Sequence, residues 1–391
     1  MGPGSPGPRP WAYGHGFERS TGARHGGELI EIQTRRAQVF FRVAGAELSL
    51  PQVWAVVSLA GIFVILALGL IRPYDFWWHV RAGQWIVDQG RVPAADLFSY
   101  TRLGEPWAYQ SWLMEVVLYL WLPIGASRGL PPGIFFHAAV ITAAYGLSLA
   151  VNQRAAGGNL RWAALVTLAA AALGISNWNV RPQTISFLFF ALTLYIIEKH
   201  AAKRLGDRGL PKRHWGVEAL AGIWPFHRLK PPLHSSQDAP TGSLRRSARW
   251  LWFLPPLFAL WANAHGGFVF GLALLGAYLL TEMLAWLRRQ RRFPTRLLGV
   301  TLLCAGATLL TPIGLGMPDY VLGFVRHPVT RSLNVEFWPP TIRSLDGQIF
   351  FAYLAILIVL LVASRYRPTP RQTVYLLLFG GLAVMVRRNT A

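Results

Sequence analysis

The chain has 391 residues, of which 53% are hydrophobic and only 14% are charged. Soluble domains carry about 25% charged residues, so this composition excludes a single water-soluble core and indicates a membrane protein. The net charge is +21, but its 38 Lys and Arg residues are spread between long apolar runs, which argues against nucleic-acid binding. The single cysteine, Cys304, excludes a disulfide framework and a cysteine metal cluster.

Residues 1–50 form a hydrophilic segment rich in Gly, Pro and Arg. The first part of it, 1–27, has too few apolar residues to offset the entropy lost on ordering. We therefore expect 1–50 to be a largely disordered cytoplasmic tail, and 51–391 to be a transmembrane domain.

Nine apolar stretches predict membrane-spanning helices, since a span needs about 20 mostly apolar residues. They lie at approximately 52–71, 132–151, 162–176, 183–198, 250–264, 267–287, 297–313, 349–363 and 373–386. A tenth stretch, Trp112–Gly125, carries Glu115 and stops at Pro123, so we expect it to lie in the membrane interface. The predicted fold class is all-α, a polytopic transmembrane bundle of about nine spans.

The distribution of positive charge predicts the orientation, because Lys and Arg collect in cytoplasmic loops. With the N-terminus inside, 27 of the 38 Lys and Arg residues fall in inner segments, which are the tail, 152–161, 199–249, 288–296 and 364–372. The basic loop 199–249 is the longest inner loop. The outer loops include 72–131 and 314–348, so the polar residues outside the spans predict an extracytoplasmic site.

The first outer loop begins with Asp75, shortly after the first predicted span. Residues 78–89 place apolar and polar side chains at helical spacing, which predicts an amphipathic helix in the membrane surface. Trp112–Gly125 would be a second juxtamembrane helix of this loop.

The sequence resembles the GT-C superfamily of membrane glycosyltransferases. Asp75 follows the first span as an acidic residue does in that superfamily. The patterns D-x-W-W-H, G-x-W-I, G-x-V-P-x-x-D-x-F-S-Y-T and P-W-x-x-x-S-W-L are similar to a bacterial subgroup, as are R-P-Q at 181–183 and W-A-N-A-H-G-G-F at 261–268. The loop has a single acid where many members carry an adjacent pair. The likeness covers roughly 50–391, and it implies a multi-pass protein of the bacterial plasma membrane.

By that resemblance, the protein would transfer a sugar from a polyprenyl-phosphate donor in the membrane lipid to an acceptor at the extracytoplasmic face. Such a reaction needs a base for the acceptor proton and a cation for the departing phosphate. The implied base is Asp75, with Asp96 as the second candidate. The implied substrate-binding residues are Trp78, His79, Arg181, Asn263, His265, Arg387 and Arg388.

Other interpretations stay open. Asp75 would also suit a solvated helix end, Arg181 could reach for lipid headgroups, and tryptophans in the first outer loop could form an interfacial belt. A divalent metal on Asp75, His79 and Asp96 is a further alternative.

Two other functions also remain, a lipid or solute transporter and a non-catalytic subunit of a complex. A transporter would carry polar residues near mid-membrane. Glu282 is the only acid well inside a predicted span, and we expect it to reach toward Arg288 or Arg289 near the inner end of its helix.

Overall fold

The computed structural model describes residues 2, 39–43, 46–69, 71, 75–121, 132–206, 249–327, 332, 338–364 and 367–386. The chain divides into two units, Met1–Val53 and Trp54–Ala391. The first contains an antiparallel hairpin of β1 (Val39–Val43) and β2 (Ala46–Ser49), which the sequence analysis did not anticipate. The expected disordered tail, 1–27, lies outside the described residues apart from Gly2.

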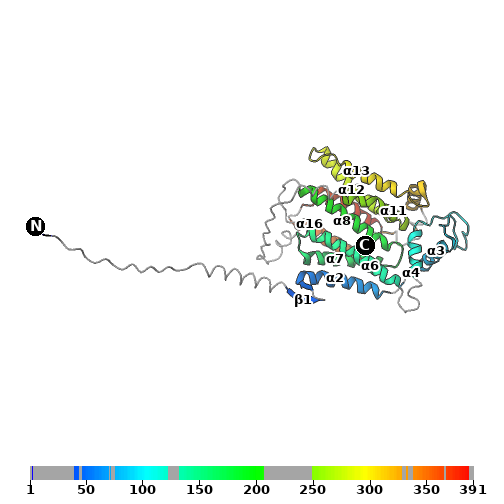
Figure 1. The fold of residues 1–391 in the computed structure, drawn as a ribbon, viewed down its shortest axis with the longest axis horizontal. Coiled ribbons are helices and arrows are strands. Elements are labelled where there is room, and N and C mark those ends of the chain that lie inside the picture. The colour runs from blue at the N-terminus through cyan, green and yellow to red at the C-terminus, as the bar shows by residue number, and fades with distance from the viewer. Residues whose placement is uncertain are drawn as a thin grey trace. The chain divides into compact units, whose positions relative to one another are not determined.

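The second unit is a helical bundle, as the composition predicts (Figure 1). Its helices are α2 (Leu50–Ala67), which begins in the first unit, α3 (Asp75–Gln89), α4 (Trp112–Trp121), α6 (Pro132–Ala155), α7 (Leu160–Gly174), α8 (Thr184–Gly206), α11 (Leu254–Ala264), α12 (Phe268–Leu287), α13 (Thr295–Ala307), α14 (Met317–Arg326), α16 (Leu345–Ala363) and α17 (Pro370–Met385). Short 3-10 turns are η1 (Ile175–Asn177), η2 (Trp250–Phe253) and η3 (Gly314–Gly316). The all-α fold class is confirmed.

Six of the nine expected spans are helices long and apolar enough to cross a membrane, counted over the described residues. They are α2, α6, α7 with η1, α8, α12 and α16. The other three expected spans form shorter helices, α11, α13 and α17, with 11, 13 and 16 residues. Prolines account for where these helices begin, because a proline ring lacks the N–H that a helix interior needs. Pro255 lies at the start of α11, Pro294 caps α13, and Pro370 opens α17.

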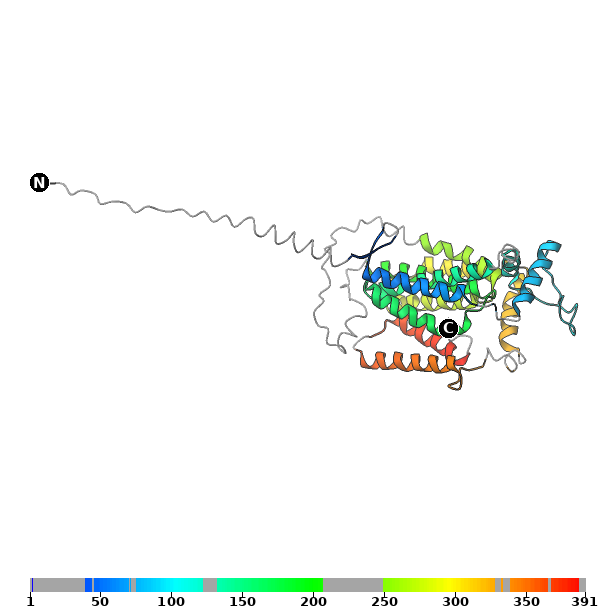
Figure 2. The ribbon, with the colours of Figure 1, turned by 90° about the horizontal axis from the view of Figure 1, so that it is seen from below.

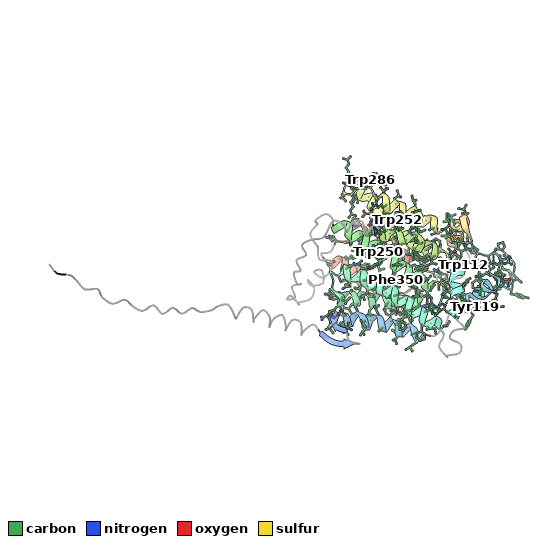
Figure 3. The ribbon with its side chains drawn as sticks, viewed as in Figure 1. Trp112, Tyr119, Trp250, Trp252, Trp286 and Phe350 are labelled. Carbon is green, nitrogen blue, oxygen red and sulfur yellow. The ribbon has the colours of Figure 1, made fainter. Side chains whose placement is uncertain are left out.

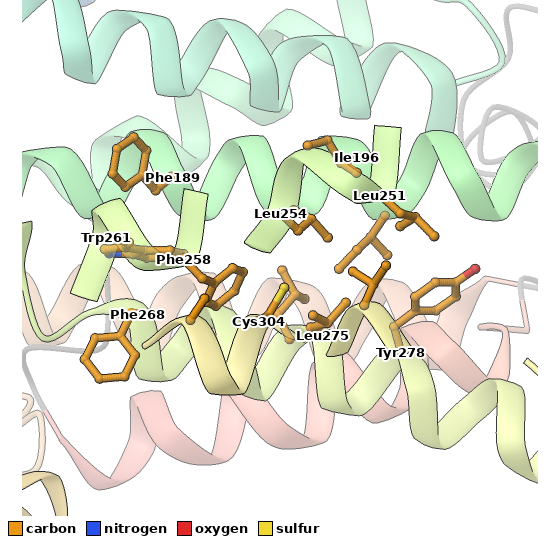
Figure 4. Packing of buried hydrophobic residues seen from close by; sticks show 14 of the residues in the cluster. Phe189, Ile196, Leu251, Leu254, Phe258, Trp261, Phe268, Leu275, Tyr278 and Cys304 are labelled. Atoms are coloured by element: carbon orange, nitrogen blue, oxygen red, sulfur yellow. The ribbon is translucent and has the colours of Figure 1, made fainter. Parts of the chain in front are cut away.

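The largest buried cluster joins α8, α11, α12 and α13 (Figure 4). Trp261 and Tyr278 are its largest fully buried side chains. Gly271 on α12 makes room for Trp261, because a Cβ at residue 271 would lie 2.4 Å from the indole ring. Association of helices in lipid depends on such close packing, since burial from water contributes little there.

In contrast to these helices, α16 presents nearly its whole surface outward. Only Gly347 and Phe350 are buried on it, and it lies at the side of the bundle in Figure 2. Its exposed side chains are almost all apolar, as expected of a helix whose solvent is lipid.

Arginines gather at one end of the bundle, in the connections between α6 and α7, α12 and α13, and α16 and α17. We call this the basic end; its described arginines there are Arg154, Arg161, Arg288, Arg289, Arg291, Arg292, Arg367 and Arg371. The tryptophans of η2 and Trp286 lie nearer this end, whereas Trp112 and Tyr119 of α4 lie at the other (Figure 3).

Two acids within the bundle are each paired with an arginine near the basic end. Glu198 on α8 accepts a 2.8 Å hydrogen bond from Arg371 on α17. Glu282 on α12 pairs with Arg291, and not with Arg288 or Arg289 as expected. The reason is the turn after α12: Arg289 adopts a left-handed backbone conformation, and the Arg291 N–H folds back to the Ala285 carbonyl.

The opposite end of the bundle carries α3, α4 and α14, and we call it the site end (Figures 1 and 2). α3 is the expected amphipathic helix, and it begins three residues earlier than expected, at Asp75. α4 has ten residues, about 15 Å of helix, and is therefore too short to cross a bilayer core of about 30 Å. The two helices touch at Gly83, where a Cβ would lie 2.0 Å from the Glu115 carbonyl oxygen.

Gly83→Ala is expected to lower the thermal unfolding temperature of the purified protein in detergent. The added methyl group forces α3 away from the α4 backbone, and overpacking of this kind costs about 1–3 kcal/mol. Gly276→Ala on α12 is the matched control, because nothing lies within 4 Å of a Cβ there. Equal unfolding temperatures for the two variants would contradict the close crossing.

Candidate functional site

Two of the predicted site residues, Asp75 and Arg181, form an ion pair. The Arg181 Nε donates to Asp75 Oδ1 at 3.0 Å, although the residues are 106 positions apart. Asp75 is the first residue of α3, and Arg181 lies in the turn that leads into α8. Val180, the residue before the arginine, packs against Phe76 of α3 and fixes this turn under the helix. The predicted base and the predicted phosphate ligand therefore lie together.

The Asp75–Arg181 pair is open to the surroundings of the protein. Its side chains are 42% exposed at Asp75 and 20% exposed at Arg181. Exposed ion pairs stabilise a fold weakly, by about 1 kcal/mol or less. A guanidinium at this position can bind a phosphate as well as a carboxylate, because its planar fork of N–H donors matches the oxygens of either anion.

His79 lies one helical turn after Asp75, on the same face of α3. Its Nδ1 is 2.9 Å from Glu115 Oε1 on α4. Glu115 is 3% exposed, and its other oxygen, Oε2, is buried without a hydrogen-bond partner. The sequence analysis did not assign Glu115 to the site; the available signal was an acid inside the otherwise apolar stretch 112–121.

Tyr320 on α14 lies close enough to Glu115 to feel its charge. Burial, followed by the nearby Glu115 carboxylate, raises the pKa of the Tyr320 phenol above its ordinary value of 10.0. A phenol kept neutral in this way is a hydrogen-bond donor. The predicted outer loop 314–348 thus contributes a helix, α14, to the surroundings of Glu115.

Trp78 is the centre of an aromatic cluster that packs the loop after α3 onto that helix. Its ring stacks on Tyr109, with centroids 6.0 Å apart and planes at 12°. Phe98 and Trp107 meet it edge-on. One face of Trp78, predicted to bind sugar, is therefore covered by protein. Trp77, on the opposite side of α3, is 59% exposed.

Asp96, the second candidate base, holds a turn together. Its Oδ1 accepts hydrogen bonds from the backbone N–H groups of Phe98 and Ser99, at 2.8 and 2.9 Å. The Ser99 hydroxyl donates to Oδ2. These bonds, the Ser99 hydroxyl first, lower the pKa of Asp96 below its ordinary 3.8. A carboxylate bonded in this way is a poor proton acceptor and a good turn-former.

Asn263 connects three elements at the site end. Its Oδ1 accepts from the Trp112 indole N–H of α4 at 2.8 Å. Its Nδ2 donates to the carbonyls of Ala259 in α11 and of Leu310 after α13, at 2.8 and 2.7 Å. The amide is therefore used in holding α4 against the end of α11.

His265 is similarly engaged with its own protein. Its Nδ1 accepts from the backbone N–H of Gly267 at 3.0 Å and lies 2.8 Å from the Ser186 hydroxyl on α8. The Trp261 indole donates to that hydroxyl at 2.8 Å. A Cβ at residue 267 would lie 2.5 Å from Ser186 Oγ, so the contact requires glycine. The sequence analysis missed Ser186, which is a lone small polar residue in an apolar span.

The structure thus brings the predicted residues together in two groups. Asp75 and Arg181 pair at the start of α3, and one turn further along that helix His79 pairs with Glu115 of α4. Asn263 and His265 belong to the contact between α4, α8 and α11, beneath that helix. Arg387 and Arg388 lie outside the described residues. Over the described residues, no group of three or more His, Cys, Asp and Glu side chains is arranged to hold a metal ion.

A cavity of about 230 Å³ lies between the end of α7 and the start of α16. Five of its seven lining residues are apolar, and the two polar ones are Ser176 and Asp346. Ser176 precedes Arg181 by five residues, so the two lie at most about 18 Å apart along an extended chain.

Comparison with known proteins identifies no family. The chain matches no protein-family model, no curated protein and no solved structure. The likeness to the GT-C superfamily accordingly rests on the sequence motifs alone, and an argument about function has to start from the geometry of the site end.

Replacing Asp96 with Ala is expected to speed backbone hydrogen exchange at Phe98 and Ser99, whose amides lose their acceptor. The folded pKa of Asp96 lies below its ordinary 3.8, so its stabilising effect is fully present above about pH 5 and is lost as pH falls through the lowered pKa. Asp88→Ala, an exposed acid on α3, is the control. Unchanged exchange at residues 98 and 99 would contradict the turn.

Proposed function

We propose that this protein is an integral membrane enzyme that transfers a glycosyl group from a polyprenyl-phosphate donor to an acceptor hydroxyl. The observation that carries the proposal is the meeting of Asp75, His79, Glu115 and Arg181, from three separate segments, at one end of an apolar bundle. Glycosyl transfer from a lipid phosphate needs a proton acceptor, a cation for the leaving phosphate and a lipid-facing setting. All three are present at the site end.

In this proposal Arg181 holds the departing phosphate. Its guanidinium offers parallel N–H donors that match phosphate geometry, whereas a lysine would act only as a point charge. Asp75 keeps the guanidinium in place before the donor binds.

The apolar cavity between α7 and α16 supports a donor with a hydrocarbon chain. A chain lying there would have its first units in the cavity and the rest in lipid, while its phosphate reaches the turn that carries Arg181. A cavity of about 230 Å³ has room only for the first carbons next to the phosphate, so its size does not select a length of polyprenyl chain.

The same geometry favours an enzyme over a transporter. The charged pairs inside the bundle, Glu198–Arg371 and Glu282–Arg291, lie near the basic end and neutralise one another. A transport path would require polar groups that converge near the middle of the membrane. A non-catalytic subunit would not require an imidazole–carboxylate pair and a guanidinium–carboxylate pair at the same end of the bundle.

We expect purified protein in lipid to transfer radiolabelled sugar from a polyprenyl-phosphate donor, and Arg181→Gln to lower the rate at least about 100-fold through loss of the charged phosphate contact. Asp75→Asn should act more weakly, mainly by raising the donor KM. Arg102→Gln, which breaks an exposed pair with Glu105, is the matched control. Equal transfer rates for wild-type protein and Arg181→Gln would contradict the role of Arg181 in binding the phosphate.

The arginine-rich basic end supports a cytoplasmic position for it and an extracytoplasmic position for the site end, as in a bacterial plasma membrane. We expect a membrane-impermeant maleimide to label a cysteine at Leu103, an exposed position after α3, in intact cells. A cysteine at Arg289 should be labelled only after permeabilisation. Both are placed in a Cys304→Ala background, since Cys304 is the chain's own thiol. The reverse pattern would invert the proposed orientation.

A further inference from the structure

We propose that His79 is the proton acceptor of the reaction and that Glu115 is its positioning residue. This inference rests on the proposed transferase function and moves the base away from Asp75, the residue that the sequence motifs indicate. It is carried by three observations: the engagement of Asp75, the hydrogen bonding of the imidazole, and the burial of Glu115.

Asp75 is committed to the arginine. Its Oδ1 receives the Arg181 Nε at 3.0 Å. With one oxygen used to orient the guanidinium, Asp75 is placed beside the departing phosphate. The ion pair therefore assigns Asp75 and Arg181 together to the leaving-group side of the reaction.

The His79 ring is held with one nitrogen directed at the protein and the other available. Nδ1 lies 2.9 Å from Glu115 Oε1, and an ionised carboxylate can only accept, so the ring proton belongs on Nδ1. The lone pair is then on Nε2. That atom makes no hydrogen bond within the described part of the chain and is not buried. An acceptor hydroxyl that approaches α3 can donate to it.

Glu115 is fixed more rigidly than a surface acid. The α3–α4 crossing presses Gly83, one turn of α3 after His79, onto the main chain of Glu115 itself, so the carboxylate is held beside the imidazole. The side chain is 3% exposed. A buried carboxylate beside a histidine fixes the tautomer and stabilises the imidazolium that forms when the ring takes a proton.

The other titratable groups near the dyad (His79 and Glu115) do not compete for this role. Asp75, one turn back along α3, and Arg181, in the turn before α8, neutralise one another. Tyr320 on α14 and Tyr109 in the loop before α4 both feel the charge of Glu115 and have pKa values raised above 10.0, chiefly by burial. They remain neutral through the pH range in which imidazole titrates.

The step balances without a metal or redox partner. The acceptor O–H proton passes to Nε2 of His79 while the acceptor oxygen forms a bond to the anomeric carbon. The bond from that carbon to the phosphate oxygen breaks, and its electron pair leaves with the polyprenyl phosphate, which Arg181 holds. The imidazolium then releases its proton to water.

The test is the pH dependence of transfer by full-length protein in lipid vesicles, with wild type, His79→Gln, Glu115→Gln and Asp75→Asn measured side by side. We expect His79→Gln to lower the transfer rate about 10²- to 10⁴-fold, which is the usual contribution of a general base to the rate. Wild-type activity should show an acid limb, since the base must be unprotonated to take the acceptor proton.

Glu115→Gln keeps the shape of the side chain and an oxygen that can accept from Nδ1, but removes the charge. The imidazolium is then less stable, so the acid limb of the profile should move to lower pH while the protein stays folded. Asp75→Asn should keep the wild-type limb. A purely structural role for Glu115 would not shift the limb, and thermal unfolding of each variant checks that it has folded.

The possible results separate the two proposals. If wild-type protein transfers sugar but His79→Gln retains the full rate, or if the acid limb disappears in Asp75→Asn, the dyad is wrong and the transferase stands. If folded wild-type protein transfers no sugar from any polyprenyl-phosphate donor, the proposed transferase function is wrong, and the role proposed for His79 and Glu115 is wrong as well. Loss of rate in His79→Gln together with a shifted limb in Glu115→Gln supports both.

Discussion

The energetic cost of an unpaired charge in lipid governs where every acid of this bundle lies. A carboxylate within a hydrocarbon layer is tolerated only when it is paired or reaches the boundary. Glu198 and Glu282 satisfy this condition by bonding to arginines near the basic end. The remaining described acids of the second unit lie around α3, α4, α14 and the start of α16, at the site end. The bundle is therefore polarised along its axis, with a cluster of arginines at one end and most of its described acids at the other.

The close crossing of α3 and α4 fixes the relative positions of the site residues on the two helices. Gly83 lets the two backbones approach until the carbonyl of Glu115 fills the space of a side chain. This approach sets the distance between His79 and Glu115, and Val180 beneath the same helix sets the distance between Asp75 and Arg181. α4 is anchored in turn by Asn263 and by Gln110, whose amide donates to the Ala262 carbonyl at 2.7 Å. The site thus depends on contacts among short segments outside the long spans.

Sequence reasoning predicted the long apolar helices, because hydropathy and length decide them. It also predicted that Asp75 and Arg181 belong to one region, since both follow or precede spans at the same end. It overestimated the lengths of α11 and α13, expected over 250–264 and 297–313, because the apolar stretches include η2 before α11 and residues after Ala307 that are not helical. Glu115 was missed because its partner His79 is 36 positions away, and only the tertiary crossing brings the two together. Asn263 and His265, expected to bind substrate, make structural hydrogen bonds that no spacing rule reveals.

The length of α4 explains why an acid can persist in so apolar a helix. With ten residues it rises about 15 Å, half of a bilayer core, so its first turn stays near the end of the bundle. Glu115 lies in that first turn, where a helix N-terminus favours negative charge. The same residue in the middle of a membrane-spanning helix would lie in lipid and would need a cationic partner, as Glu198 has in Arg371. The short α4 thus keeps Glu115 close to the end of the bundle. There the carboxylate can lie beside the imidazole of His79 without an arginine or lysine partner.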